Sequence, residues 1–150
     1  AEANEDTFHF TNCAPQHTKL NKGTWSQLEE YILKNAGRNT IRISVFTGPV
    51  FREDDLLYKG KYKIPAEFWK VVAMVRDDNT LSATAYLQTQ KNLIADLEFA
   101  YGEYQTFQVP VATIEKLTCI DFGPLRSHDP LASIEATVGR LIERSGDIRL

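Results

Sequence analysis

Residues 69–90, WKVVAMVRDDNTLSATAYLQTQ, decide the fold class of this chain. Two runs rich in apolar and β-branched residues, 69–76 and 81–90, flank the polar tetrapeptide Asp77-Asp78-Asn79-Thr80, which is a good hairpin turn. The second run alternates cleanly, with apolar side chains at every other position: Leu81, Ala83, Ala85 and Leu87. The pattern predicts two adjacent antiparallel strands.

Further strands are expected on both sides of this hairpin. Residues 41–47 (IRISVFT) are β-branched and aromatic, are followed by Gly48-Pro49, and predict a buried strand that ends there. Shorter extended stretches are expected at residues 7–11 and 107–110. The YKGKYK stretch within residues 53–63 is typical of a surface loop or an edge hairpin.

Helical spacing of apolar residues occurs in three places. The first helix is expected to begin at a Thr24–Gln27 capping box and to end at Asn35-Ala36-Gly37. Its apolar stripe consists of Trp25, Leu28 and Ile32. A short helix is expected over residues 111–118, and a last one begins at Asp129-Pro130, an N-cap followed by proline. The stripe of this last helix is made of Leu131, Ile134, Val138, Leu141 and Ile142.

The composition is that of an ordinary globular domain, with 150 residues, 43% hydrophobic residues and a formal net charge of −3. The slightly acidic balance argues against a protein that holds nucleic acid by bulk positive charge. No apolar run approaches the roughly 20 residues that cross a bilayer, so no membrane partner is expected. With no repeat or linker to divide the chain, we predict one α+β domain with a mainly antiparallel central sheet and flanking helices.

The sequence lacks the common cofactor and hydrolase signatures, such as G-x-G-x-x-G, the phosphate-binding P-loop, G-x-S-x-G and H-E-x-x-H. Its densest polar cluster lies between a predicted strand and the following helix and consists of Asn12, Gln16, Asn21 and Glu29. Amide and carboxylate oxygens suit Mg²⁺, which keeps most of its waters and accepts few protein ligands. The spacing alone favours a structural interpretation, with turn formers, a helix-start residue and a solvated glutamate.

The same region forms a string of spaced motifs: residues 7–16 (TFHFTNCAPQ), 20–25 (LNKGTW) and 28–29 (LE). This string resembles the DNA/RNA non-specific endonucleases of the ββα-metal superfamily, whose pattern is D-T-F-Y-L-S-N-x-x-P-Q-x-x-x-L-N-x-x-x-W-x-x-L-E. The likeness continues through residues 45–49 and 64–71 to residues 111–118, so that it covers the chain up to about Phe122. The resemblance implies a ββα-metal nuclease-like fold.

The resemblance also implies a role for each member of the polar cluster. Asn21 corresponds to the main protein ligand of Mg²⁺ in the family. Mn²⁺ is expected to substitute for Mg²⁺ at this site. Glu29 corresponds to the glutamate that orients the waters of the metal, and Asn12 and Gln16 correspond to polar residues that line the same site. The implied reaction is metal-dependent, sugar-non-specific endonucleolytic hydrolysis of DNA and RNA, with 5′-phosphate products.

One element of the family pattern is absent from the sequence. The general base of the family is a histidine in Asp-Arg-Gly-His, which lies well before the asparagine motif, whereas only 11 residues precede Asn12 here. None of the three histidines of the chain, His9, His17 and His128, follows Asp-Arg-Gly. We therefore expect residues 1–150 to be the C-terminal portion of a single nuclease domain, with a complementary N-terminal fragment that binds it and supplies the base.

Several alternatives stay open at this point. The chain could be a non-catalytic nucleic-acid-binding or interaction module that retains the nuclease fold, or a subunit whose partner contacts matter more than its site. A homodimer is also compatible with the sequence. The family likeness favours a secreted or periplasmic location.

Two further features have two interpretations each, and a third has one. Cys13 and Cys119 could form one disulfide or be two buried thiols, and Cys13 is expected to be a small buried side chain. The three lysines at 59, 61 and 63, interleaved with tyrosines at 58 and 62, fit a phosphate-contacting arm or a solvated edge hairpin. Strand position and packing explain Lys70 without any chemistry.

Overall fold

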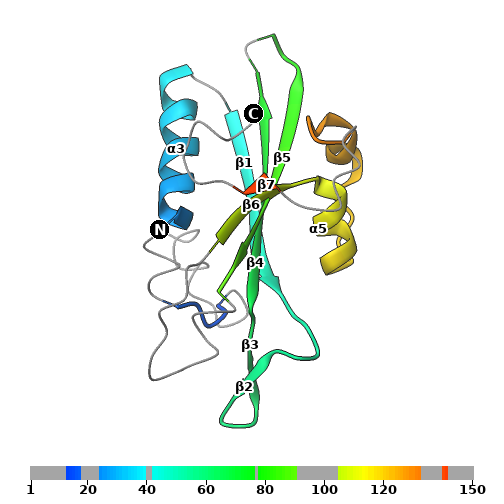
Figure 1. The fold of residues 1–150 in the computed structure, drawn as a ribbon. Helices are drawn as coiled ribbons and strands as arrows, with labels where there is room; N and C mark the ends of the chain where they lie inside the picture. The colour runs from blue at the N-terminus through cyan, green and yellow to red at the C-terminus, as the bar shows by residue number, and fades with distance from the viewer. Residues whose placement is uncertain are drawn as a thin grey trace, which may run out of the picture.

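The computed structural model describes residues 13–17, 24–39, 42–76, 78–90, 105–132 and 140–141. Five antiparallel strands form the central sheet in the order β1 (Arg42–Val50), β4 (Glu67–Val75), β5 (Leu81–Thr89), β6 (Gln105–Val109) and β7 (Arg140–Leu141). A separate hairpin consists of β2 (Leu56–Tyr58) and β3 (Tyr62–Ile64). The α3 helix (Thr24–Asn39) covers one face of the sheet, and α5 (Val111–Thr118) with the short 3₁₀ helix η2 (Gly123–His128) covers the other (Figure 1). This α+β architecture confirms the predicted fold class and is consistent with a ββα-metal nuclease-like fold.

The face of the sheet under α5 is an apolar core. Val111 and Ile114 on α5 pack against side chains that alternate along the strands, as the sequence pattern predicts. The buried strand residues of this cluster are Val50, Trp69, Val71, Ala83, Ala85 and Val109. The phenyl ring of Phe122 lies edge-on to the Trp69 indole, with ring centroids 5.6 Å apart. This half of the core is what the hydrophobic periodicity alone can specify.

The face under α3 is mainly apolar along β4 and mainly polar along β5 and β6. Leu28 and Ile32 of α3 pack with Phe68, Val72 and Met74 of β4, which confirms two members of the predicted inward stripe of the helix. The side chain of Trp25, its third member, lies outside those that the structure describes. The same face also carries buried polar side chains, which are Lys70, Ser82, Thr84, Tyr86, Gln88, Gln90, Thr106 and Gln108. A buried polar group has to be hydrogen-bonded to avoid a large desolvation cost, so such a layer indicates a site rather than a simple core.

The prediction of a buried strand at residues 41–47 is wrong in two respects. Within the described residues β1 is an edge strand that pairs only with β4, and its side chains Val45 and Phe46 are each 45% exposed. The strand also continues through Gly48 and Pro49 to Val50. An edge strand tolerates proline because no neighbour needs its missing N–H, which explains why the Gly-Pro pair does not end it.

Gly48 lies opposite Trp69 in the β1–β4 register. A Cβ atom placed on Gly48 would approach Cζ2 of the Trp69 side chain to 3.0 Å, which is closer than such contacts normally are. The absence of a side chain at this position therefore lets the indole lie flat against the strand. The same indole also packs edge-on against Phe122, so two neighbours hold its position.

The predicted C-terminal helix is wrong over its last part. Leu141 belongs to β7 and pairs with Phe107 of β6, while residues 133–139 of the predicted helix lie outside the described residues. Asp129 does cap a helix, but the helix is α5: its carboxylate accepts the amide of Val111 at 2.6 Å and that of Leu131 at 2.8 Å. Burial raises the pKa of Asp129 above its usual range, although both amide hydrogen bonds act to lower it.

The other element predictions stand as follows. The α3 helix begins at Thr24 as expected but continues through Gly37 to Asn39. The two strands of the 69–90 hairpin, the extended segment before Pro110 and the helix at 111–118 are all confirmed. Residues 53–63 hold the β2–β3 hairpin, and the strand expected at 7–11 lies outside the described residues. No described helix is long and apolar enough to span a bilayer.

Candidate functional site

Glu29 is positioned by the amphipathic pattern of α3. Leu28, its neighbour, and Ile32, one turn on, are buried against the sheet, so the 100° step per residue places Glu29 at the border of the buried stripe. Its side chain is 51% exposed. A shallow depression of about 440 Å³ adjoins it along the outer face of the helix, lined by Ser26, Glu29, Glu30, Leu33 and Lys34. The carboxylate is therefore held at the sheet yet remains accessible from solvent.

Lys70 meets Glu29 from the sheet below. The Lys70 side chain is only 2% exposed, and its Nζ lies 2.6 Å from Oε1 of Glu29, which is both a hydrogen bond and an ion pair. Burial lowers the pKa of Lys70 below its usual range, although the hydrogen bond and the charge of Glu29 act to raise it. Because only one end of this pair is desolvated, the contact fixes the direction of the Glu29 carboxylate without burying its charge.

The strands on either side of β4 complete the surroundings of Lys70. Thr47 of β1 and Tyr86 of β5 are its partners in the register. Burial raises the pKa of Tyr86 to about 12, so this phenol stays neutral at any physiological pH. Lys70 thus lies between two neutral side chains, those of Thr47 and Tyr86, in the register of the sheet.

Gln16 lies in a segment that is tied to the sheet by Gln90. The fully buried Gln90 amide accepts the backbone N–H of His17 at 2.8 Å and donates to the carbonyl oxygens of Pro65 at 2.7 Å and Pro15 at 3.4 Å. Ala14 packs against the core cluster that contains Leu28, so the segment lies on the α3 side. Gln16 and Glu29, both predicted site residues, are therefore brought to the same face of the sheet.

Asn12 and Asn21, the other two predicted site residues, lie outside the described residues. The described residues contain no group of three or more His, Cys, Asp or Glu side chains that could hold a metal ion. The predicted site differs from such a group, since it depends on amide oxygens and a single carboxylate. Gln16 and the accessible carboxylate of Glu29 are oxygen donors that fit a hydrated Mg²⁺ or Mn²⁺.

Lys70 is the residue of this site that the sequence analysis missed. Packing was expected to explain it, but its charge is paired with a predicted site residue. The signal was a single charge inside the apolar run FWKVVAMV, at a position that alternates with Phe68 and Val72 and so faces the helix. A buried lysine requires a partner, and the helix facing it carries Glu29.

The histidines and cysteines that the structure describes lie as follows. The backbone of His17 is bound to Gln90, and His128 is exposed at the end of η2. Cys13 and Cys119 are both exposed thiols instead of a disulfide, so the expectation that Cys13 is buried is wrong, and the alternative of two buried thiols is wrong as well. Cys13 is exposed because its neighbour Ala14, and not Cys13, provides the contact with the core.

Comparison with known proteins adds to this geometry. A family model described as DNA/RNA non-specific endonuclease matches residues 1–128. The chain is 35% identical, over 162 aligned positions, to the uncharacterized protein y4fB of Sinorhizobium fredii, an alignment that covers 99% of the chain and 24% of that protein. It is 29% identical to a nuclease of Nostoc sp., with 91% of the chain and 50% of that protein covered. It is 26% identical to mitochondrial endonuclease G of Homo sapiens, with 82% and 43% covered.

The chain thus spans half or less of the length of each of these relatives. The matches confirm the resemblance found in the sequence.

Proposed function

This chain belongs to the DNA/RNA non-specific endonuclease family, and we propose that it forms the metal-binding portion of a nuclease that hydrolyses both DNA and RNA. The observation that carries the proposal is the Lys70–Glu29 pair, which holds a half-exposed carboxylate in a fixed direction on the same face of the sheet as the segment that contains Gln16. A glutamate that was simply a solvent-exposed residue of the helix would not need a buried ammonium group beneath its carboxylate.

In the proposed site Asn21 would supply the protein ligand to Mg²⁺, and Glu29 would orient water around the ion. Asn12 and Gln16 line the same site and contact the phosphate group. The bound ion would stabilise the charge that develops on the phosphate and on the leaving 3′ oxygen. Lys70 acts through Glu29, because its ammonium holds the carboxylate in place.

The general base is proposed to come from outside residues 1–150. We propose that the chain is the C-terminal portion of a single nuclease domain and that an N-terminal fragment of the same protein carries the histidine of Asp-Arg-Gly-His. That histidine would accept a proton from the water that attacks phosphorus, and the phosphate would stay on the 5′ oxygen of the downstream product. The exposed β1 edge, with Val45 and Phe46 uncovered, supports the binding of such a fragment.

A complementation assay tests this proposal. Residues 1–150 are incubated with supercoiled plasmid and Mg²⁺, alone and with the preceding segment of the same protein, and nicking is followed on gels. We expect no cutting by residues 1–150 alone and cutting of DNA and RNA after addition of the segment. A segment whose Asp-Arg-Gly-His histidine is replaced by alanine serves as the matched control. It is expected to bind residues 1–150 without restoring cleavage.

Two outcomes would contradict the proposal. Robust cutting by residues 1–150 alone would mean that the base lies within them. Salt-dependent retention on DNA, with no cleavage even after complementation, would instead support a non-catalytic nucleic-acid-binding module.

A further inference from the structure

The β2–β3 hairpin projects from the lower end of the central sheet (Figure 1). Its register pairs Tyr58 directly with Tyr62, and both side chains are more than half exposed, at 52% and 55%. Directly opposed residues of an antiparallel pair share one face, so the two rings stand side by side. That face carries Leu56, Tyr58, Tyr62 and Ile64. The hairpin thus presents an exposed aromatic surface that nothing in the described residues covers.

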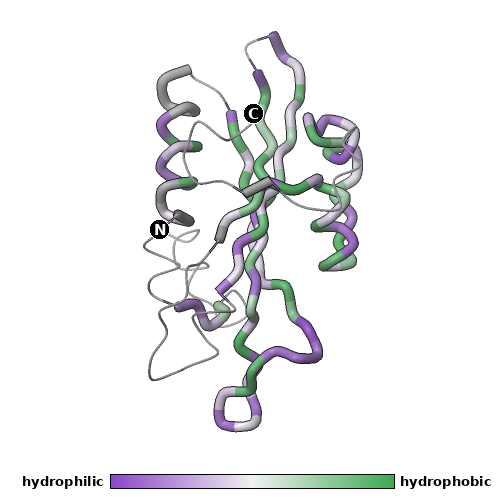
Figure 2. Tube along the Cα trace, in the orientation of Figure 1, coloured by the Kyte–Doolittle hydropathy of each residue, from purple (hydrophilic) through white to green (hydrophobic). Residues whose placement is uncertain are grey.

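Two lysines flank the rings at the tip of the hairpin. The Nζ of Lys59 lies 5.3 Å from the ring centroid of Tyr58, and the Nζ of Lys61 lies 5.3 Å from that of Tyr62. Both distances are within the range of a cation–π contact. Figure 2 shows the change from apolar strand residues to a hydrophilic tip. A ligand that reaches the tip therefore meets two ammonium groups and two aromatic rings together.

The charge of this segment is opposite to that of the whole chain. Residues 56–66 contain three lysines and no acidic residue, whereas the chain has a net charge of −3. The ammonium of Lys63 donates to the carbonyl oxygen of Arg52 at 2.7 Å and so helps to hold the base of the hairpin. The positive charge at the tip is that of Lys59 and Lys61. A locally basic tip on an acidic chain favours a focused contact with an anion.

The backbone at the tip disfavours the lysine that is found there. Lys59 has φ 53° and Gly60 has φ 65°, and the amide of Lys61 donates to the carbonyl of Tyr58 at 3.1 Å. These are the features of a type I′ turn, whose first central position favours asparagine, aspartate or glycine. A long side chain in the left-handed region is strained, and strained residues are concentrated at functional positions. Lys59 is thus at a position where structure alone would favour another residue.

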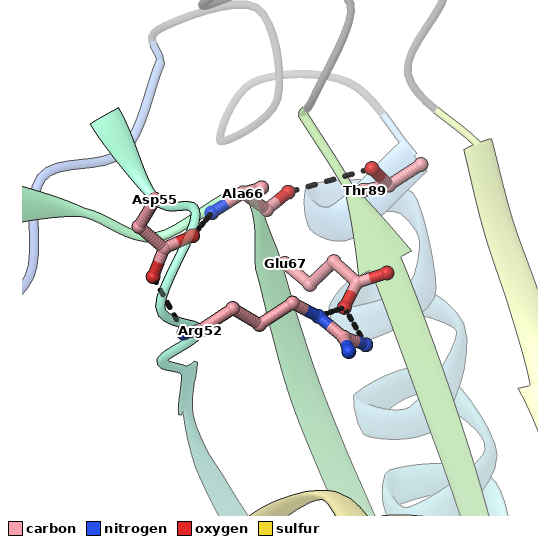
Figure 3. A network of polar contacts seen from close by, with 5 residues as sticks. All are labelled: Arg52, Asp55, Ala66, Glu67 and Thr89. Carbon is pink, nitrogen blue, oxygen red and sulfur yellow. Dashed lines mark hydrogen bonds and ion pairs between the residues drawn. The ribbon is translucent and has the colours of Figure 1, made fainter.

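The base of the hairpin is fixed to the sheet (Figure 3). The buried carboxylate of Asp55 accepts the amide of Arg52, before β2, at 2.8 Å and that of Ala66, after β3, at 3.1 Å. The guanidinium of Arg52 in turn donates from Nε to Glu67 at 2.7 Å. These contacts join both legs of the hairpin to the start of β4. The tip is therefore presented in a defined direction, which lowers the entropy cost of binding.

We propose that the β2–β3 tip binds a single strand of nucleic acid, with phosphates at Lys59 and Lys61 and bases stacked on Tyr58 and Tyr62. Stacking on an aromatic ring with flanking cations is how proteins hold single strands without reading their sequence. The proposal rests on the proposed function for the identity of the ligand. It goes beyond that function because it assigns a binding surface on a different element from the metal site.

The test measures binding separately from cleavage. The full 150-residue chain is titrated against a fluorescein-labelled oligothymidylate in EDTA, and fluorescence anisotropy is followed over a series of salt concentrations. We expect Lys59→Asn and Lys61→Gln each to weaken binding and to reduce the slope of log K against log salt by about 0.7. Lys116→Gln on α5, the matched control, removes the same charge from an exposed position and is expected to leave the slope unchanged.

Measurements of stability and two new hairpin variants separate binding from folding. Lys59→Asn places a favoured residue in the left-handed turn, so its urea midpoint is expected to equal or exceed that of the parent chain while binding falls. Tyr62→Thr keeps a strand-forming residue but removes the ring, and is expected to weaken binding about five-fold or more. Leu57→Thr, on the other face of the hairpin, is its control and is expected to bind as the parent does.

Three results would overturn the proposal. They are an unchanged affinity and salt slope in both lysine variants, an equal loss of binding in Lys116→Gln, and competition by poly-L-glutamate as strong as that by unlabelled oligonucleotide. The last result would assign the tip to an acidic protein partner. Cleavage by the complemented protein is scored independently. A tip that binds the oligonucleotide without any cleavage by the complemented protein would sustain this inference and refute the proposed function. Cleavage with no binding at the tip would refute this inference and sustain the proposed function.

Discussion

The ammonium of Lys70 and the carboxylate of Glu29, which are 41 residues apart in the sequence, join β4 to α3 through a contact of 2.6 Å. One member is almost completely buried and the other is half exposed. The two ends of the pair therefore have different requirements. The buried ammonium of Lys70 needs the negative charge of Glu29 to offset its desolvation. The exposed carboxylate of Glu29 needs Lys70 only to fix its orientation.

Lys70→Met is expected to reduce cleavage by the complemented protein about 10- to 100-fold, as losses of residues that orient a metal site do. The urea midpoint is expected to stay the same or rise, because methionine fills the space without a buried charge. Glu30→Gln, which alters an exposed neighbour paired with Lys34, is the control and should cleave normally. Equal activity of Lys70→Met and the parent would remove Lys70 from the site.

The same pair predicts a pH dependence of stability. The pKa of Lys70 is lowered in the folded state from 10.5, so between the two values the unfolded chain binds more protons than the folded chain. The free energy of unfolding contributed by Lys70 therefore rises with pH across this window, and the cost of burying its charge is present in full below it. Urea denaturation of the parent and of Lys70→Met, from neutral pH to pH 10.5, should show the parent gaining relative to the variant. A constant difference would contradict this sign.

Gln90→Leu is expected to release the segment that contains Gln16. The substitution removes the acceptor of the His17 amide and the donor to the Pro65 carbonyl, and buried groups left unpaired cost about 1–3 kcal/mol. Hydrogen exchange at the His17 amide should become faster, and cleavage by the complemented protein should fall. Gln90→Asn, which keeps the amide but shortens its reach, is expected to behave in the same way. Unchanged exchange at His17 would show that another contact holds the segment.

Asn21→Ala is expected to abolish cleavage by the complemented protein, because the change removes the proposed metal ligand, while the free energy of unfolding stays within about 0.5 kcal/mol of the parent. Binding of Mn²⁺, followed by electron paramagnetic resonance, should be lost in parallel. Asn21→Asp retains an oxygen donor and is expected to bind Mn²⁺. Near-normal activity of Asn21→Ala would exclude this residue as the ligand.

Gly48→Ala is expected to destabilise the fold by about 1–3 kcal/mol, because the new Cβ would approach the Trp69 indole to 3.0 Å. The indole also packs edge-on against Phe122, which hinders its movement away from the strand. The near-ultraviolet circular dichroism of the tryptophans should change as the ring moves. Ser44→Ala, which alters an exposed position on the same strand, is the control. If both variants unfold at the same urea concentration as the parent, the strand must be able to move away from the indole.

The parts of the fold that the sequence predicts are those decided by neighbours in the chain. The β4–β5 hairpin follows from its own turn, and α5 follows from its own three-residue spacing. Leu141 was assigned to a helix because its spacing fits one, but pairing with Phe107 of β6 places it in a strand. A two-residue pairing with a distant strand leaves no local signal, so tertiary contacts override the helical pattern.

The site was predicted to a similar extent. The resemblance identified Glu29 and Gln16, which the structure brings to one face, but it carried no signal for Gln90, whose amide holds the Gln16 segment from far along the chain. Lys70 was visible as an isolated charge in an apolar run, and its partner could be named only once β4 and α3 were known to face each other. Contacts between distant elements are therefore what the sequence leaves undetermined.

The carboxylate of Asp129 has a practical consequence for anyone who trims this protein. The match to the endonuclease family model ends at residue 128, one position before the group that accepts the first amide of α5. A fragment cut at that border would lose the acceptor for Val111 and, with it, a support of the helix that seals the apolar side of the sheet. A domain boundary drawn from the family match alone would thus give a less stable protein. The expressed chain should extend at least to Ala132, where the turn that begins at Asp129 closes.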